Sequence, residues 1–108
     1  MKIPADAVIQ REKLTHHLLV PKPRNDKAGF LAQVGFTEHN PDLLEAAIRQ
    51  LIGANEALLD REDEYGRFYQ VQGDLRGPHG ILSTITIWIE QRADGQFRFV
   101  TLKPARRR

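Results

Sequence analysis

Apolar and polar residues alternate with a period of two between residues 65 and 101, and this pattern predicts β-strands. The run from Ile81 to Glu90 is the clearest case, because its odd-numbered positions are almost all isoleucine. Gly77-Pro78-His79-Gly80 and Ala93-Asp94-Gly95 interrupt the alternation with residues that favour chain reversal. We therefore expect an antiparallel meander of three strands joined by two turns.

The first half of the chain has apolar residues at helical spacing and predicts three helices. The first, from Arg11 to Leu19, ends at a proline-containing segment, because a residue before proline avoids the α region. The second follows the capping pair Asn25-Asp26 and ends near Gly35, where a left-handed residue is expected. The third begins at Asn40-Pro41-Asp42 and carries an apolar stripe to about Gly53.

Helices followed by strands predict an α+β fold, with the N-terminal helices packed on one face of a C-terminal meander of three, or slightly more, strands. The isoleucine side of residues 81–90 is expected to face the helices. The opposite side, with Thr84, Thr86 and Trp88, is then left open to a ligand or partner. We expect one domain over 1–108, made of a helical part (10–53), a meander (67–102) and a basic tail (103–108).

Composition and charge narrow the class of protein. A chain of 108 residues can bury a core of its own, and it contains no cysteine for disulfides, thiolate metal sites or nucleophiles. No apolar run is long enough to span a bilayer, and we expect a soluble, cytoplasmic protein. The net charge is only +2, but basic residues cluster around Lys22 and at the C-terminal end, while 60–64 is interpreted as an acidic loop.

The residues that could take part in catalysis do not form a recognisable metal or cofactor motif. The four histidines lack ligand spacing, and neither a phosphate loop nor a Rossmann motif occurs. Cationic, phenolic and hydroxyl side chains remain, and metal-free RNA cleavage needs such groups for proton transfer and for the phosphorane charge. Cross-strand ion pairs are the structural alternative. The catalytic candidates are His16, Lys27, Tyr65, Arg67 and Thr101, and the candidates for binding nucleic acid or a partner are Lys22, Arg24, Arg76, Thr86, Trp88 and Arg98.

The segments KLTHHLLVPKPRNDKAGFLAQVGF, YGRFYQV, LRGPHG, TIWI and FRFVT together resemble a family of small bacterial proteins, often cyanobacterial, classed as a domain of unknown function. More distantly similar domains occur at the C-terminal ends of Rhs-type polymorphic toxins. That similarity implies an effector module, such as a ribonuclease of the barnase, colicin and RelE-like kind. Those toxin modules carry histidine and lysine together before an Ala-x-x-Phe step. This chain has Asn25-Asp26 at the histidine-like position, so Lys27 is the matched cation.

Two hypotheses follow. In the first, the chain is a metal-independent RNase-like toxin domain in which Lys27 and Arg67 stabilise phosphate, Tyr65 or His16 transfers protons, and Thr101 orients. In the second, it is a non-catalytic interaction protein that docks a partner through the open sheet face or an edge strand. The expected partners are RNA, an antitoxin-like protein or a second copy of the chain, with no membrane, cofactor or metal.

Overall fold

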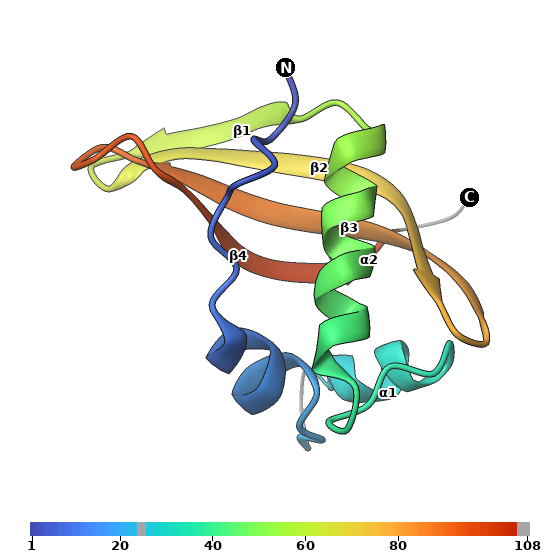
Figure 1. The fold of residues 1–108 in the computed structure, drawn as a ribbon. Helices are drawn as coiled ribbons and strands as arrows, with labels where there is room; N and C mark the ends of the chain where they lie inside the picture. Colours follow the sequence, from blue (N-terminus) through green and yellow to red (C-terminus); the bar gives the residue numbers. More distant parts are fainter. Residues whose placement is uncertain (24–25, 106–108) are drawn as a thin grey trace.

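The fold is a two-layer α+β arrangement, seen in a computed structural model that describes residues 1–23 and 26–105 (Figure 1). Three short helical elements lie on one face of an antiparallel sheet, which confirms the predicted fold class. In chain order the elements are η1 (Lys13–Leu18), α1 (Lys27–Ala32), α2 (Pro41–Ala54), β1 (Leu58–Asp63), β2 (Gly66–Gly77), β3 (Gly80–Gln91) and β4 (Phe97–Pro104).

The sheet has four strands in the order β1-β2-β3-β4, so each strand pairs with its neighbour in the chain. The long pairing of β2 with β3 runs without a break from Gly66–Gln91 to Gly77–Gly80. The additional strand is β1, which includes most of the segment expected to be an acidic loop. Its residues Asp60 to Asp63 have low intrinsic strand preference, and pairing with β2 overrides that preference.

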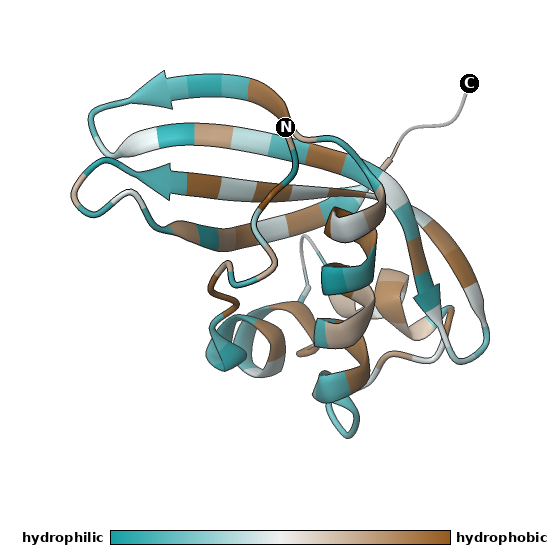
Figure 2. Ribbon diagram, turned by 45° about the horizontal axis from the view of Figure 1, so that its top comes forward, coloured by the Kyte–Doolittle hydropathy of each residue, from teal (hydrophilic) through white to brown (hydrophobic). Residues whose placement is uncertain are grey.

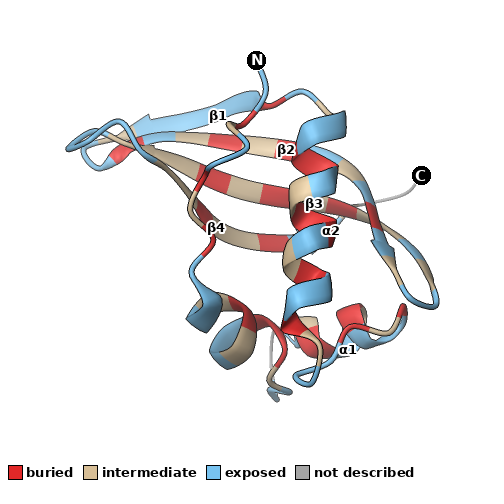
Figure 3. Cartoon of the chain, viewed as in Figure 1, coloured by how far each residue is buried: buried red, intermediate tan, exposed pale blue. Residues whose placement is uncertain are grey.

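The face of the sheet that packs on the helices is the one that was predicted to be open. Thr84, Thr86 and Trp88 are buried against the helices, whereas the isoleucines of β3 are half-buried or exposed on the other face. The prediction that Thr86 and Trp88 lie on an open face is therefore wrong. Figure 3 shows buried and less buried residues alternating along the central strands, and Figure 2 shows the apolar and polar bands of the sheet.

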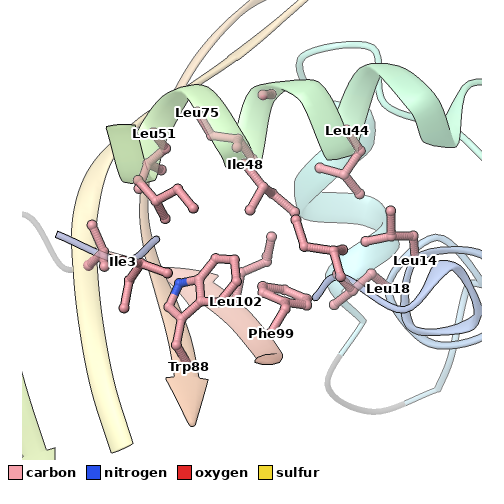
Figure 4. Close-up of a cluster of buried hydrophobic side chains, with 14 of the residues drawn as sticks. Ile3, Leu14, Leu18, Leu44, Ile48, Leu51, Leu75, Trp88, Phe99 and Leu102 are labelled. Carbon is pink, nitrogen blue, oxygen red and sulfur yellow. The ribbon is translucent and has the colours of Figure 1, made fainter. Parts of the chain in front are cut away.

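A hydrogen-bond network explains how Thr86 enters the core beside Trp88. The Thr86 hydroxyl donates to the Val71 carbonyl oxygen at 3.1 Å and accepts the Trp88 indole N–H at 2.8 Å. Both polar side chains are thus satisfied without water. Trp88 supplies the volume that fills the space under the helices and meets Phe99 edge-on, with 5.3 Å between ring centroids. Figure 4 shows Trp88 and Phe99 facing Leu44, Ile48 and Leu51 of α2.

The three predicted helices are present, with differences at their ends. Asp26 caps α1 by accepting from the Gly29 N–H at 3.3 Å, and Gly35 adopts φ +94° after it; Asn25 lies outside the described residues. Asn40 precedes α2 but makes no side-chain cap, because its amide instead bonds Thr37 N and Gly35 O. The first helix is a π-helix, closed by Leu19 N donating to Leu14 O.

The two edges of the sheet are treated differently. At β4, the N-terminal segment adds a parallel bridge, in which Val8 N donates to Phe97 O and Phe99 N donates to Val8 O, both at 2.8 Å. At β1, no described residue pairs with the outer edge, and Leu58 and Leu59 are 64% and 59% exposed. The β4 edge is therefore covered by the N-terminal segment, whereas the β1 edge is open among the described residues.

We expect alanine to have opposite effects at two glycines. At Gly66 (φ +154°) an added Cβ would lie 2.1 Å from the Glu90 carbonyl oxygen, so Gly66→Ala should cost about 1–3 kcal/mol. At Gly53, near the end of α2, a Cβ meets nothing within 4 Å, and Gly53→Ala should stabilise by about 0.5–1 kcal/mol. Urea denaturation of both variants tests this, and equal midpoints would contradict it.

Candidate functional site

Two of the predicted catalytic residues meet at the β4 edge. Lys27, the first residue of α1, donates from Nζ to Thr101 Oγ1 at 2.7 Å. A β-bulge in β4 lies next to this position, since the consecutive β3 residues Ile87 and Trp88 pair with Thr101 and Phe99. The bulge leaves Val100 as the extra residue and re-aims the strand beside α1. Residues that are 74 positions apart in the chain are therefore in direct contact.

Other basic groups surround this contact. The Lys13 ammonium donates to the Val100 carbonyl oxygen at 3.3 Å. Lys13, His17 and Leu18 of η1 line a pocket of about 240 Å³ together with Val100 and Thr101. Lys22 and Lys103 lie close enough to act electrostatically on Lys27. We call this cluster the β4 notch, and its members are Lys13, His17, Lys22, Lys27, Thr101 and Lys103.

The ionisable side chains that define the β4 notch are all basic. Partial burial lowers the pKa of the Lys27 ammonium, and the positive charges of Lys103 and Lys22 lower that pKa further. Among residues 1–23 and 26–105, the ion pairs do not involve any lysine of the notch. A cluster of cations without such a partner has a favourable interaction with an anion, most of all one that also accepts hydrogen bonds.

Tyr65 and Arg67 lie near the β1–β2 turn, away from the β4 notch. Arg67 pairs with Glu90, three residues along β2 from the Gln70–Ile87–Thr101 row. Strand geometry then puts its Cα roughly 14 Å from that of Thr101, and the side-chain alternation puts it on the other face. The Arg67 Nε donates to Glu62 at 3.5 Å, and Tyr65 is 69% exposed at the β1–β2 turn. The structure does not bring these two residues to Lys27.

The remaining basic candidates are spread over the molecule. His16 is exposed on η1 and is not among the residues that line the notch pocket. Arg76 is exposed near the β2–β3 turn, opposite Ile81. Arg98 lies opposite Ile89 and donates to the Gln91 side chain at 2.8 Å. Arg24 and the C-terminal Arg106 to Arg108 lie outside the described residues.

Sequence reasoning overlooked Lys13 and His17. They are four residues apart in a helical segment, so a shared face could have been inferred from their spacing. Which of the adjacent histidines faces the sheet depends on the π-helical phase of η1, which the apolar pattern does not specify. The position of Thr101 beside α1 depends on a bulge, and bulges also have little signal in a single sequence.

The face of the sheet away from the helices is here called the outer sheet face. It adjoins the notch, because Thr101 and Lys103 belong to both. Its cross-strand rows follow from the pairing register. From the notch towards the β1–β2 turn these rows are Gln72–Ile85–Lys103, Leu58–Gln70–Ile87–Thr101 and Arg61–Phe68–Ile89–Arg98.

Comparison with known proteins gives a family and no nearer relative. No helix in the described part of the chain has the length and apolar character needed to cross a membrane. No curated protein and no solved structure matches the chain. A family model described as a domain of unknown function, DUF6883, matches residues 4–106 of the 108. Since that match spans nearly the whole sequence, the chain belongs to the DUF6883 family.

Proposed function

We propose that the β4 notch binds an RNA phosphodiester and cleaves it without a metal ion. The observation that carries the proposal is the contact between Lys27 and Thr101 within a cluster of cations. A hydroxyl group fixes the position of the ammonium, and burial and neighbouring charge make that ammonium a stronger acid than an exposed lysine. These are the properties of a positioned proton donor.

The proposed reaction is transesterification within the RNA. His17 accepts the proton of the 2′-hydroxyl, the 2′ oxygen forms a bond to the adjacent phosphorus, and the bond from phosphorus to the 5′ oxygen breaks. Lys27 donates its Nζ proton to that leaving oxygen, while Lys13 and Lys103 stabilise the negative charge that develops on the phosphoryl oxygens. Thr101 holds Lys27 in place. The products are a 2′,3′-cyclic phosphate and a 5′-hydroxyl end.

This assignment differs from the sequence-based hypothesis in two roles. Proton transfer is given to His17 because it lines the notch pocket with Thr101, whereas His16 does not. Phosphate binding is given to Lys13 and Lys103, since Arg67 on β2 is engaged with Glu62 near the β1–β2 turn. Lys27 and Thr101 keep their place at the centre of the site.

Purified protein is expected to cleave single-stranded RNA in excess EDTA and to leave a 2′,3′-cyclic phosphate, detectable by mass spectrometry. An oligonucleotide with a single 2′-deoxy position should be spared at that position, because the attacking hydroxyl is missing there. A Lys2→Ala variant is the control for preparation and folding, since Lys2 bonds Gly53 O outside the notch. Protein that leaves RNA intact, or cleavage that EDTA abolishes, would overturn the proposal.

The second hypothesis, docking of a protein partner, is favoured by exposed apolar residues that the structure assigns to β1 and β3. Leu58, Leu59 and Ile81 are all at least half exposed. In a docking role these residues would take the place of Thr86 and Trp88 in the sequence-based hypothesis. A protein inactive on RNA that forms a discrete dimer in light scattering, broken by Ile81→Lys, would support docking in place of cleavage; a monomer would contradict self-docking.

A further inference from the structure

The outer sheet face contains one stacked arrangement of a cation on an aromatic ring. The Arg61 guanidinium carbon lies 3.8 Å from the centroid of the Phe68 ring. Arg61 on β1 and Phe68 on β2 are register partners, so the sheet itself sets their separation. The Arg61 side chain also pairs with Asp63 at 3.0 Å, which restrains it on the ring. More than half of the Arg61 side chain remains exposed.

This arrangement presents the flat face of a guanidinium group to solvent. A guanidinium group is planar, and its outer face is free when its inner face lies on an aromatic ring. Nucleobases stack on guanidinium planes as they do on aromatic rings, and single-stranded RNA is commonly bound in this way. The backbone phosphates of the same strand have opposite charge to the guanidinium.

We propose that the Arg61–Phe68 pair is a nucleobase-stacking platform that binds single-stranded RNA next to the β4 notch. The inference rests on the proposed function, and it names the class of substrate: an unpaired strand of several nucleotides. Duplex RNA is disfavoured, because its base faces are already stacked and paired inside the helix.

Distance and charge support the connection between platform and notch. Phe68 and Thr101 are separated by two strand spacings and two residues along the strand, or roughly 12 Å between Cα atoms. A short extended segment of single strand can span this separation. Gln70 and Ile87 share the row of Thr101, and Arg98 and Lys103 add positive charge on the β4 side. The same surface thus offers stacking at one end and phosphate contacts at the other.

The platform can be tested by comparing a short and a longer substrate. Removing a stack costs about 1–3 kcal/mol, equivalent to roughly a 5- to 150-fold change in affinity. We expect Arg61→Ala to raise KM for a single-stranded hexanucleotide at least fivefold, with kcat nearly unchanged. Cleavage of a dinucleotide, which is too short to reach the platform, should be unaffected. Arg61 is exposed, so the variant should fold, and circular dichroism checks this.

Two further variants separate stacking from charge and from folding. Arg61→Lys keeps the charge but lacks the planar group, so it should behave like Arg61→Ala. Lys2→Ala removes a cation elsewhere and should change KM less than twofold. If Arg61→Lys restores wild-type KM, the group acts through charge alone and the platform is overturned. Equal KM values for Arg61→Ala and wild type, or equal cleavage of duplex and single strands, would also overturn it.

The failure of this inference can be told apart from the failure of the proposed function. RNA cleavage by the wild type that is insensitive to Arg61 leaves the notch in place and removes only the platform. Absence of cleavage by the wild type removes both. A fully 2′-deoxy hexanucleotide, which this chemistry cannot cleave, gives the stacking contribution directly as a binding constant measured by fluorescence anisotropy; no weakening by Arg61→Ala there would count against the platform.

Discussion

Trp88→Ala is expected to lower the free energy of unfolding by about 3–5 kcal/mol, which is a large part of the stability of a domain of this size. Trp88 is fully buried and packs on Phe99, and its indole N–H donates to Thr86 Oγ1. The substitution removes the largest side chain of the core and leaves a cavity beneath α2. Trp88 is the only tryptophan, so the variant has no tryptophan fluorescence. Its unfolding transition should therefore be followed by circular dichroism.

Ile81→Ala is the matched control on the same strand. Ile81 is 50% exposed, so its truncation leaves no closed cavity and should cost under about 1 kcal/mol. Trp88→Phe should fall between the two variants, because it keeps most of the aromatic volume but loses the donor to Thr86. If Trp88→Ala and Ile81→Ala had equal unfolding midpoints, the assignment of sheet faces would be contradicted.

Lys27→Met is expected to reduce RNA cleavage by about 10²- to 10⁴-fold, the range typical for loss of a general acid. Methionine keeps an unbranched side chain of similar length but cannot donate a proton to the leaving oxygen. Thr101→Val should cause a smaller loss, since it removes only the hydroxyl that positions the Lys27 ammonium. Lys2→Met is the matched control for loss of a lysine. Single-turnover rates that are equal for Lys27→Met and Lys2→Met would refute the assignment.

Lys27→Met should lower RNA cleavage, but it should maintain or raise the stability of the fold at neutral pH. The pKa of Lys27 is lowered in the folded protein by burial first and then by Lys103 and Lys22. The unfolded chain therefore binds more protons in the window below the ordinary lysine pKa of about 10.4, and the contribution of Lys27 to stability rises with pH there. Relative to wild type, Lys27→Met should be as stable or more stable at pH 7, with the difference shrinking towards pH 10. Urea midpoints at the two pH values measure this.

The fold class was predictable because its signals are local. Apolar spacing and proline placement located α2, and glycine-rich turns located the ends of β3. The face of β3 that enters the core was not predictable in the same way. Isoleucine is the stronger hydrophobe, but burial also depends on what the neighbouring strands present. The Trp88 row carries Tyr69 and Phe99, whereas the Ile87 row carries Gln70 and Thr101.

The candidate site was predictable only in part for a related reason. Lys27 and Thr101 were selected individually from the sequence, but their contact depends on a bulge in β4 and on the start of α1. His17 was missed because the choice between adjacent histidines depends on the π-helical turn of η1. Tyr65 and Arg67 were placed with Lys27 because residue chemistry alone carries no distance information, and the register of β2 separates them.

The open edge at β1 has a consequence for how the protein behaves at high concentration. A free strand edge is a template for pairing with another chain, and exposed leucines strengthen that tendency. In this strand the leucines are followed by Asp60, Arg61, Glu62 and Asp63, and the pairing register shifts between Leu59 and Arg61. Four consecutive charged residues and a bent edge make a continuous intermolecular ladder unfavourable. The same four charged residues that obscured β1 in the sequence thus help to protect the sheet from aggregation.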